Sequence, residues 1–137
     1  MSSAAGSWLN LAKQDALAAR KLLQPPPSLP HAAYFVQQAA EKAIKAQLIH
    51  LGIDFPRHGG RGHDLVALAG LVPPADPMKM MCEALAAVTP WATAFRYPSD
   101  DPATELRLTV QDVEGRLDQV DVLIRILGTL HQDGSQT

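Results

Sequence analysis

The residues best suited to chemistry lie in a glycine-rich stretch, IDFPRHGGRGHD, over residues 53–64. It holds two arginines and two histidines within seven residues: Arg57, His58, Arg61 and His63. Arginine binds phosphate through paired N–H groups, and histidine transfers protons near neutral pH. We therefore take Arg57, Arg61 and His63 as candidate phosphate-binding residues. The alternative interpretation is a solvated loop that ends in a helix cap.

A second candidate is the segment FRYP, over residues 95–98. Arg96 offers a planar fork for phosphate, and Tyr97 offers a ring on which a base can stack. The alternative is structural, with Arg96 paired to Glu41 or an aspartate and Tyr97 filling the end of a helical bundle. If helix packing brings this segment and the glycine-rich loop to one end of the bundle, Arg57, Arg61 and Arg96 form one positive cluster.

Metal and thiol chemistry have weak signals. His58 and His63 could coordinate a metal ion, but no third ligand follows at a defined helical spacing, so we expect no metal site and no cofactor. Cys82 is the only cysteine, which excludes an intramolecular disulfide and a cysteine-based zinc site within one chain. Methionines surround it at positions 78, 80 and 81, and this predicts a buried, unreactive thiol.

Apolar residues at steps of three and four predict the helices that position these residues, and proline and glycine separate them. The second long helix is predicted to expose a polar surface made of Gln37, Gln38, Glu41, Lys42 and Lys45. Its apolar face carries several alanines, which allow close packing. The predicted helices cover residues 8–23, 30–51, 64–71, 76–89, 91–96 and 102–131.

The predicted fold class is therefore all-α, an antiparallel up-down bundle of four main helices with one or two additional short helices. We expect a disordered N-terminus over residues 1–7, a single helical domain over residues 8–131 and a disordered tail over residues 132–137. In the last helix, Asp112 with Arg116 and Asp121 with Arg125 are predicted to form ion pairs one turn apart.

Composition restricts the function classes. The net charge of −2 and the pI near 6.2 give no overall attraction to phosphate, so a nucleic-acid site must be a local patch. No apolar run is long enough to cross a bilayer, and the segment MSSAAGSW lacks the features of a signal peptide. We expect a cytoplasmic protein that makes no contact with a membrane.

Three segments together resemble one family. They are QQAAEKAIKAQL followed by GIDFPR and HDL, then WLNLAKQDALAARKLL with its acidic Asp15, and TPWATAFRYP. They resemble the HEPN domain, the helical "higher eukaryotes and prokaryotes nucleotide-binding" module, over residues 8–130. The resemblance implies that Glu41 and Lys42 face a nucleotide or partner, although a solvated charged face explains them equally well.

Some HEPN proteins are metal-independent RNases, which carry an arginine, four to six further residues and a histidine near the start of a late helix. No histidine follows Arg96 at that spacing. Arg57 and His63 have five residues between them, but they lie in the earlier loop. We therefore identify no catalytic residues and expect no RNase activity.

The resemblance implies a nucleotide- or RNA-binding module, and the missing histidine after Arg96 indicates that it is not catalytic. The resemblance also implies a homodimer that acts with a separate minimal nucleotidyltransferase, as a toxin-antitoxin-like pair. Phe35, Trp91 and Leu106 are candidate interface residues. Two alternatives stay open: a metal-independent RNase toxin with a displaced or degenerate Arg/His site, and a structural dimerising adaptor.

Overall fold

The computed structural model describes residues 3–56, 64–92 and 108–135, and every regular element in these ranges is helical. Three helices are long: α1 (Ala4–Leu22), α2 (Leu29–His50) and α5 (Val110–Ser135). Two are short, α3 (Leu65–Leu71) and α4 (Lys79–Leu85), and the 3₁₀ helix η2 (Ala86–Ala92) continues α4. Within the described ranges, no helix is long and apolar enough to span a membrane.

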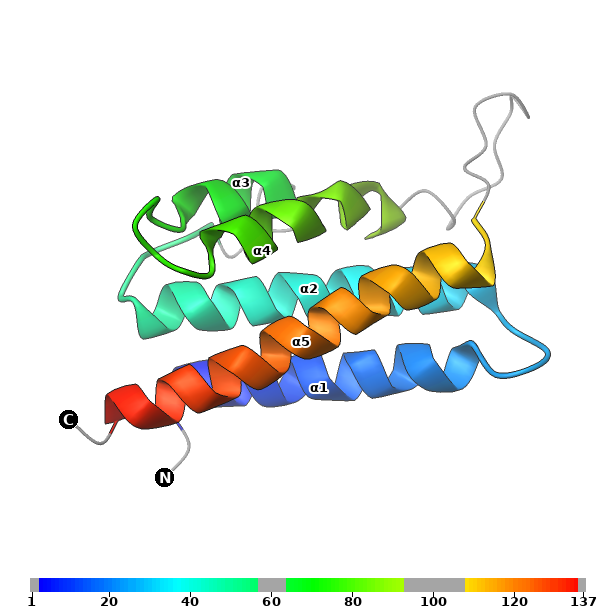
Figure 1. Cartoon of the computed structure of the whole chain (residues 1–137), viewed down its shortest axis with the longest axis horizontal. Helices are drawn as coiled ribbons and strands as arrows, with labels where there is room; N and C mark the ends of the chain where they lie inside the picture. The colour runs from blue at the N-terminus through cyan, green and yellow to red at the C-terminus, as the bar shows by residue number, and fades with distance from the viewer. Residues whose placement is uncertain (1–2, 57–63, 93–107, 136–137) are drawn as a thin grey trace.

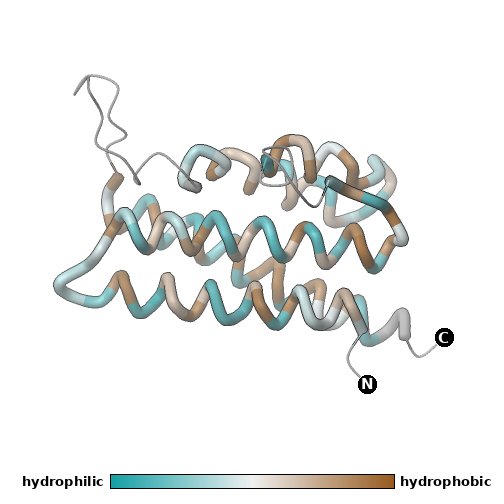
Figure 2. Tube along the Cα trace, turned by 180° about the vertical axis from the view of Figure 1, so that it is seen from behind, coloured by the Kyte–Doolittle hydropathy of each residue, from teal (hydrophilic) through white to brown (hydrophobic). Residues whose placement is uncertain are grey.

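The predicted all-α bundle is confirmed. One of its four main members is not a single long helix but the short helix α4 continued by η2. Successive members α1, α2, the α4–η2 segment and α5 alternate in direction (Figure 1). α2 lies between α1 on one side and α3 and η2 on the other, and α5 crosses diagonally over α2 and α1 (Figure 1). Hydrophilic and hydrophobic positions alternate along the long helices (Figure 2), as amphipathic packing requires.

α1 begins one turn earlier than predicted. Ser3, not Ser7, is the N-cap, and its hydroxyl oxygen accepts a hydrogen bond from the Gly6 N–H at 2.9 Å. Residues 4–7 are therefore helical rather than disordered. The predicted apolar face of α1 is confirmed, because Leu9, Ala12, Ala16 and Ala19 are buried.

A single helix over residues 76–89 is not formed, because the helix tightens after Leu85 into the 3₁₀ segment that contains Pro90. Proline has no N–H with which to bond the carbonyl four residues earlier. The Thr89 hydroxyl takes that role and donates to the Ala86 carbonyl at 2.8 Å. α3 begins as predicted, with Asp64 as its N-cap.

α5 begins at Val110 rather than near Pro102, and it extends to Ser135. Its start is a reciprocal cap, in which the Asp112 N–H donates to the Thr109 hydroxyl and the Thr109 N–H donates to the Asp112 carboxylate. Residues 132–135 are therefore helical rather than a disordered tail, since extending an existing helix adds a backbone bond per residue. The predicted helix 91–96 lies largely outside the described residues.

The two ion pairs predicted within α5 are not formed. Asp112 is used in the cap, and Asp121 pairs with Arg20 of α1. Arg116 donates instead to the carbonyl of Ala84 in α4 at 3.3 Å. These charged side chains therefore link α5 to its neighbours and the preceding loop, which a pattern within one helix does not reveal.

Candidate functional site

A row of polar residues on α2 is buried, where a solvent-exposed surface was predicted. Gln37, Glu41 and Lys45 follow one another at intervals of one turn, and each is less than 5% exposed. The Lys45 ammonium lies 3.0 Å from the Glu41 carboxylate, and the Gln37 amide donates to the other carboxylate oxygen at 3.3 Å. The prediction of exposure was wrong because these side chains satisfy one another along the helix, which makes burial tolerable.

Two aromatic side chains cover this row at its Lys45 end. Lys45 Nζ lies 5.4 Å from the ring centroid of Trp8, in α1, and 5.7 Å from that of Phe55, which follows α2. Both distances are within the range of cation–π attraction. Buried ion pairs gain little net stability compared with apolar residues. Lys45 contacts residues of α1 and of the start of the glycine-rich loop as well as Glu41 of its own helix.

Lys42 lies beside the row and bridges two helices. Its ammonium forms an ion pair with Asp15 of α1, and both side chains are largely buried. Asp15 is the acidic residue of the first helix noted in the sequence. Lys42 and Lys45 each have a carboxylate partner, so neither is an unpaired cation awaiting a phosphate group.

The other predicted site residues, Arg57, Arg61, His63, Arg96 and Tyr97, lie outside the described residues, and so does His58. The described residues that flank them do make contact. The Leu65 N–H, just after the first loop, donates to the Thr89 hydroxyl at 3.2 Å. Thr89 belongs to η2, the last described element before Arg96. That Arg57, Arg61 and Arg96 form one cluster stays a prediction.

A second polar cluster, which no sequence pattern predicted, joins the C-terminal parts of α2 and α5. The rings of His50 and His131 stack with centroids 4.1 Å apart. Gln47 connects His131 to Asp76: its amide N–H donates to Asp76 at 3.0 Å, and its oxygen lies 2.8 Å from His131 Nε2. Gln47 lies on the otherwise apolar side of α2, which is the one signal that could have found the cluster.

The hydrogen bonds of this cluster determine the protonation of His131. Because the Gln47 NH₂ group donates to Asp76, its oxygen faces His131 Nε2, and that nitrogen carries a proton. Nδ1 is buried, and no described residue forms a hydrogen bond with it. Burial, together with the neighbouring His50, lowers the pKa of His131 from 6.5 to about 4. His131 is therefore neutral at pH 7.

Cys82 is buried, as predicted. Burial is the main cause that raises its thiol pKa to about 12, and the nearby Asp76 acts in the same direction. A thiol with that pKa is not a nucleophile at pH 7. In the part of the chain that the structure describes, no three His, Cys, Asp or Glu side chains are grouped as metal ligands.

The fold and the site together define a small all-helical bundle whose second helix carries a buried row of polar side chains. A family model described as HEPN domain matches residues 5–130, nearly the whole chain. The chain therefore belongs to the HEPN domain family. Neither the curated proteins nor the solved structures gave a significant match.

Proposed function

We propose that this HEPN domain binds a nucleotide or an RNA segment without cleaving it, and that it acts with a separate minimal nucleotidyltransferase as a toxin-antitoxin-like pair. Family membership supports a nucleotide- or RNA-related role. The lack of a histidine at the expected spacing after Arg96 supports binding without catalysis.

The hydrogen bond between the Leu65 N–H and the Thr89 hydroxyl is the structural observation that supports a shared site for the arginines. It joins the end of the segment that holds Arg57 and Arg61 to the element that precedes Arg96. A chain with a net charge of −2 needs local positive charge to hold phosphate, and these arginines are the proposed source of it. The pairing of Lys42 and Lys45 with carboxylates supports assigning this role to the arginines.

The test is a binding screen with purified full-length protein, labelled mononucleotides and short single-stranded RNA, with cleavage followed in the same tubes. Arg96→Ala, and the double change Arg57→Ala with Arg61→Ala, should each weaken binding. Each lost phosphate contact should also reduce the slope of log binding constant against log salt concentration by about one unit. The matched control is Lys13→Ala with Lys21→Ala, which removes two exposed charges from α1.

Each outcome of the screen has a meaning. Binding without cleavage, lost in the arginine variants and kept in the lysine control, supports the proposal. RNA cleavage that disappears in His63→Ala contradicts it in favour of an RNase with a displaced site. Absence of any nucleotide or RNA binding contradicts it in favour of a structural adaptor. A minimal nucleotidyltransferase encoded by a neighbouring gene should co-purify with the chain when the two are co-expressed.

A further inference from the structure

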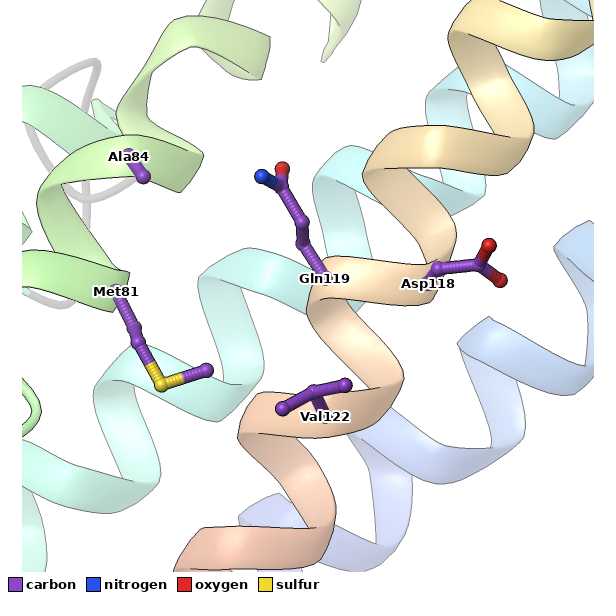
Figure 3. A pocket seen from close by; sticks show the side chains of 5 residues that line it. All are labelled: Met81, Ala84, Asp118, Gln119 and Val122. Atoms are coloured by element: carbon purple, nitrogen blue, oxygen red, sulfur yellow. The ribbon is translucent and has the colours of Figure 1, made fainter.

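A groove of about 260 Å³ lies between α4 and α5, and the polar row of α2 is not part of its lining (Figure 3). Met81 and Ala84 of α4 face Gln119 and Val122 of α5 across it, and Asp118 also contributes to the lining, with its carboxylate pointing away from α4. Pockets that hold drug-sized ligands have volumes of about 300 Å³ or more. This groove therefore fits one planar ring system rather than a whole cofactor.

The polar groups of the groove are oriented by Arg116. Its Nη1 donates to the Gln119 side-chain oxygen at 3.1 Å and to the Ala84 carbonyl at 3.3 Å. Because arginine can only donate, the amide of Gln119 must present its oxygen to Arg116. The Gln119 NH₂ group is left to donate elsewhere, and no described residue accepts from it. The side chain projects toward α4, over the groove (Figure 3).

Arg116 also places a positive charge at the edge of the groove. No described carboxylate pairs with it, and its remaining N–H groups have no acceptor among the described residues. The nearby carboxylate of Asp118 pairs with Arg20 of α1, at 3.0 Å, and Arg20 also pairs with Asp121. A ligand here meets an apolar slot, one free amide donor and a cation held in place by two hydrogen bonds.

We propose that the α4–α5 groove binds the base of a nucleotide, with its phosphate toward Arg116. The base would lie among Met81, Ala84 and Val122, where a thioether makes favourable contacts with aromatic rings, and would accept a hydrogen bond from Gln119. This inference rests on the proposed nucleotide-binding function and names the place where the base is held. A free nucleotide and a single-stranded RNA both present this chemistry.

Methyl NMR of the full-length protein, labelled at the methionine methyl groups, tests the location directly. The ligands are AMP, GMP, CMP, UMP, a short single-stranded RNA and inorganic phosphate. A base in the groove should shift the Met81 methyl signal through its ring current. Met80, the preceding residue of α4, is 81% exposed and should not move. A stronger effect of the RNA than of any mononucleotide identifies RNA as the source.

Variants separate the groove from the rest of the molecule. Ala84→Leu fills the slot at an exposed helical position and should abolish the Met81 shift. Arg116→Gln should weaken nucleotide binding about tenfold or more, the effect of losing one charged hydrogen bond. Arg125→Gln removes an exposed positive charge from the same helix and should bind like the unaltered protein. Circular dichroism of each variant verifies the fold.

The two proposals fail differently. If equilibrium dialysis shows nucleotide binding but Met81 does not shift, or Ala84→Leu binds normally, the groove is not the base site and the proposed function survives. If no nucleotide or RNA binds at all, both are wrong. Loss of the Met81 shift in Ala84→Leu, together with normal binding by Arg125→Gln, supports the groove.

Discussion

At the scale of single residues, the Glu41–Lys45 pair is the most demanding arrangement in the molecule. Both side chains are 4% exposed, so removing the lysine leaves a buried carboxylate without its cation. We expect Lys45→Met to lower the free energy of unfolding by about 3 kcal/mol. The double change Glu41→Leu with Lys45→Met should recover most of that loss, because it removes both buried charges.

Urea unfolding of the two single variants and the double variant measures this coupling as a thermodynamic cycle. Arg20→Met provides the comparison, because Arg20 and its partners Asp118 and Asp121 are more than a third exposed. That variant should lose less than about 1 kcal/mol. Equal losses in Lys45→Met and Arg20→Met would contradict the buried character of the Glu41–Lys45 pair.

His131 makes stability depend on pH. Its pKa is lowered to about 4 in the folded protein, from 6.5 in the unfolded chain, so the unfolded state binds this proton more readily. The stability that neutral His131 contributes is complete above pH 6.5 and is lost as the pH falls toward about 4. Unfolding in urea at pH 7 and pH 5 should show this loss, and His131→Gln should reduce it.

The corresponding change at an exposed histidine is the control. His31 is near the start of α2 and bonds only to Ser28 among the described residues. His31→Gln should leave the difference between pH 7 and pH 5 unchanged. A His131→Gln protein that loses stability between these pH values as steeply as the unaltered protein would show that other groups dominate.

At the scale of elements, Thr89 joins two short helices that would not be stable alone. Its hydroxyl donates to the Ala86 carbonyl and accepts from the Leu65 N–H, so it completes η2 and the start of α3 together. Thr89→Val leaves both backbone groups unpaired and should cost about 1–3 kcal/mol. Amide hydrogen exchange should accelerate at Leu65, where the protein loses an acceptor.

Thr129→Val is the matched control for this change. Thr129 is exposed on α5, and its hydroxyl donates to the Arg125 carbonyl, a group that also has its helical partner. Its loss should change the free energy of unfolding by less than about 0.5 kcal/mol. If Leu65 exchanges no faster in Thr89→Val, the hydrogen bond between α3 and η2 does not hold these elements together.

How far the sequence predicts these elements depends on the range of the interactions involved. The apolar faces of α1 and α5 and the cap at Asp64 follow from neighbours within a few residues, and the sequence predicts them. The burial of Glu41 and Lys45 depends on Trp8 and Phe55, which belong to other segments. The partner of Asp121 is Arg20, about a hundred positions away, so the helical spacing suggested Arg125 instead.

In the candidate site, too, the sequence indicates residue types but not the contacts between distant segments. Arg57, Arg61 and Arg96 are recognisable from residue type alone, and they lie outside the described residues. The cluster of Gln47, His50, Asp76 and His131 combines isolated polar residues from three segments, none of which forms a motif. The groove between α4 and α5 depends on how two helices pack, and the sequence contains no sign of it.

At the scale of the whole molecule, we propose that the protein is a homodimer. Exposed apolar residues such as Leu17 on α1 and Val66 on α3 are available for contact, at 56% and 62% exposure. Of the three residues suggested for the interface, Trp91 is buried within the chain at 8% exposure and leaves little surface for a partner. Phe35 is half-buried, and Leu106 lies outside the described residues.

Sedimentation equilibrium at tens of micromolar, the order of concentration at which weak dimers form, should give twice the mass of 14.7 kDa. Leu17→Glu and Val66→Glu are informative variants, because each places a charge on a different exposed face. The variant that yields a monomer identifies the face in contact. A monomer from the unaltered protein would contradict the dimer.

The central position of α2 determines the order in which the helices should unfold. α2 packs against α1, α3, η2 and α5, whereas α4 with α3 and η2 forms one outer layer. Loss of that layer exposes only one side of α2 and leaves the three long helices in contact. Unfolding of α2 itself would expose the apolar faces of all the helices that pack against it. The backbone amides of α2 should therefore be the last to exchange with solvent, and partial unfolding should begin in the outer layer and stop at α2.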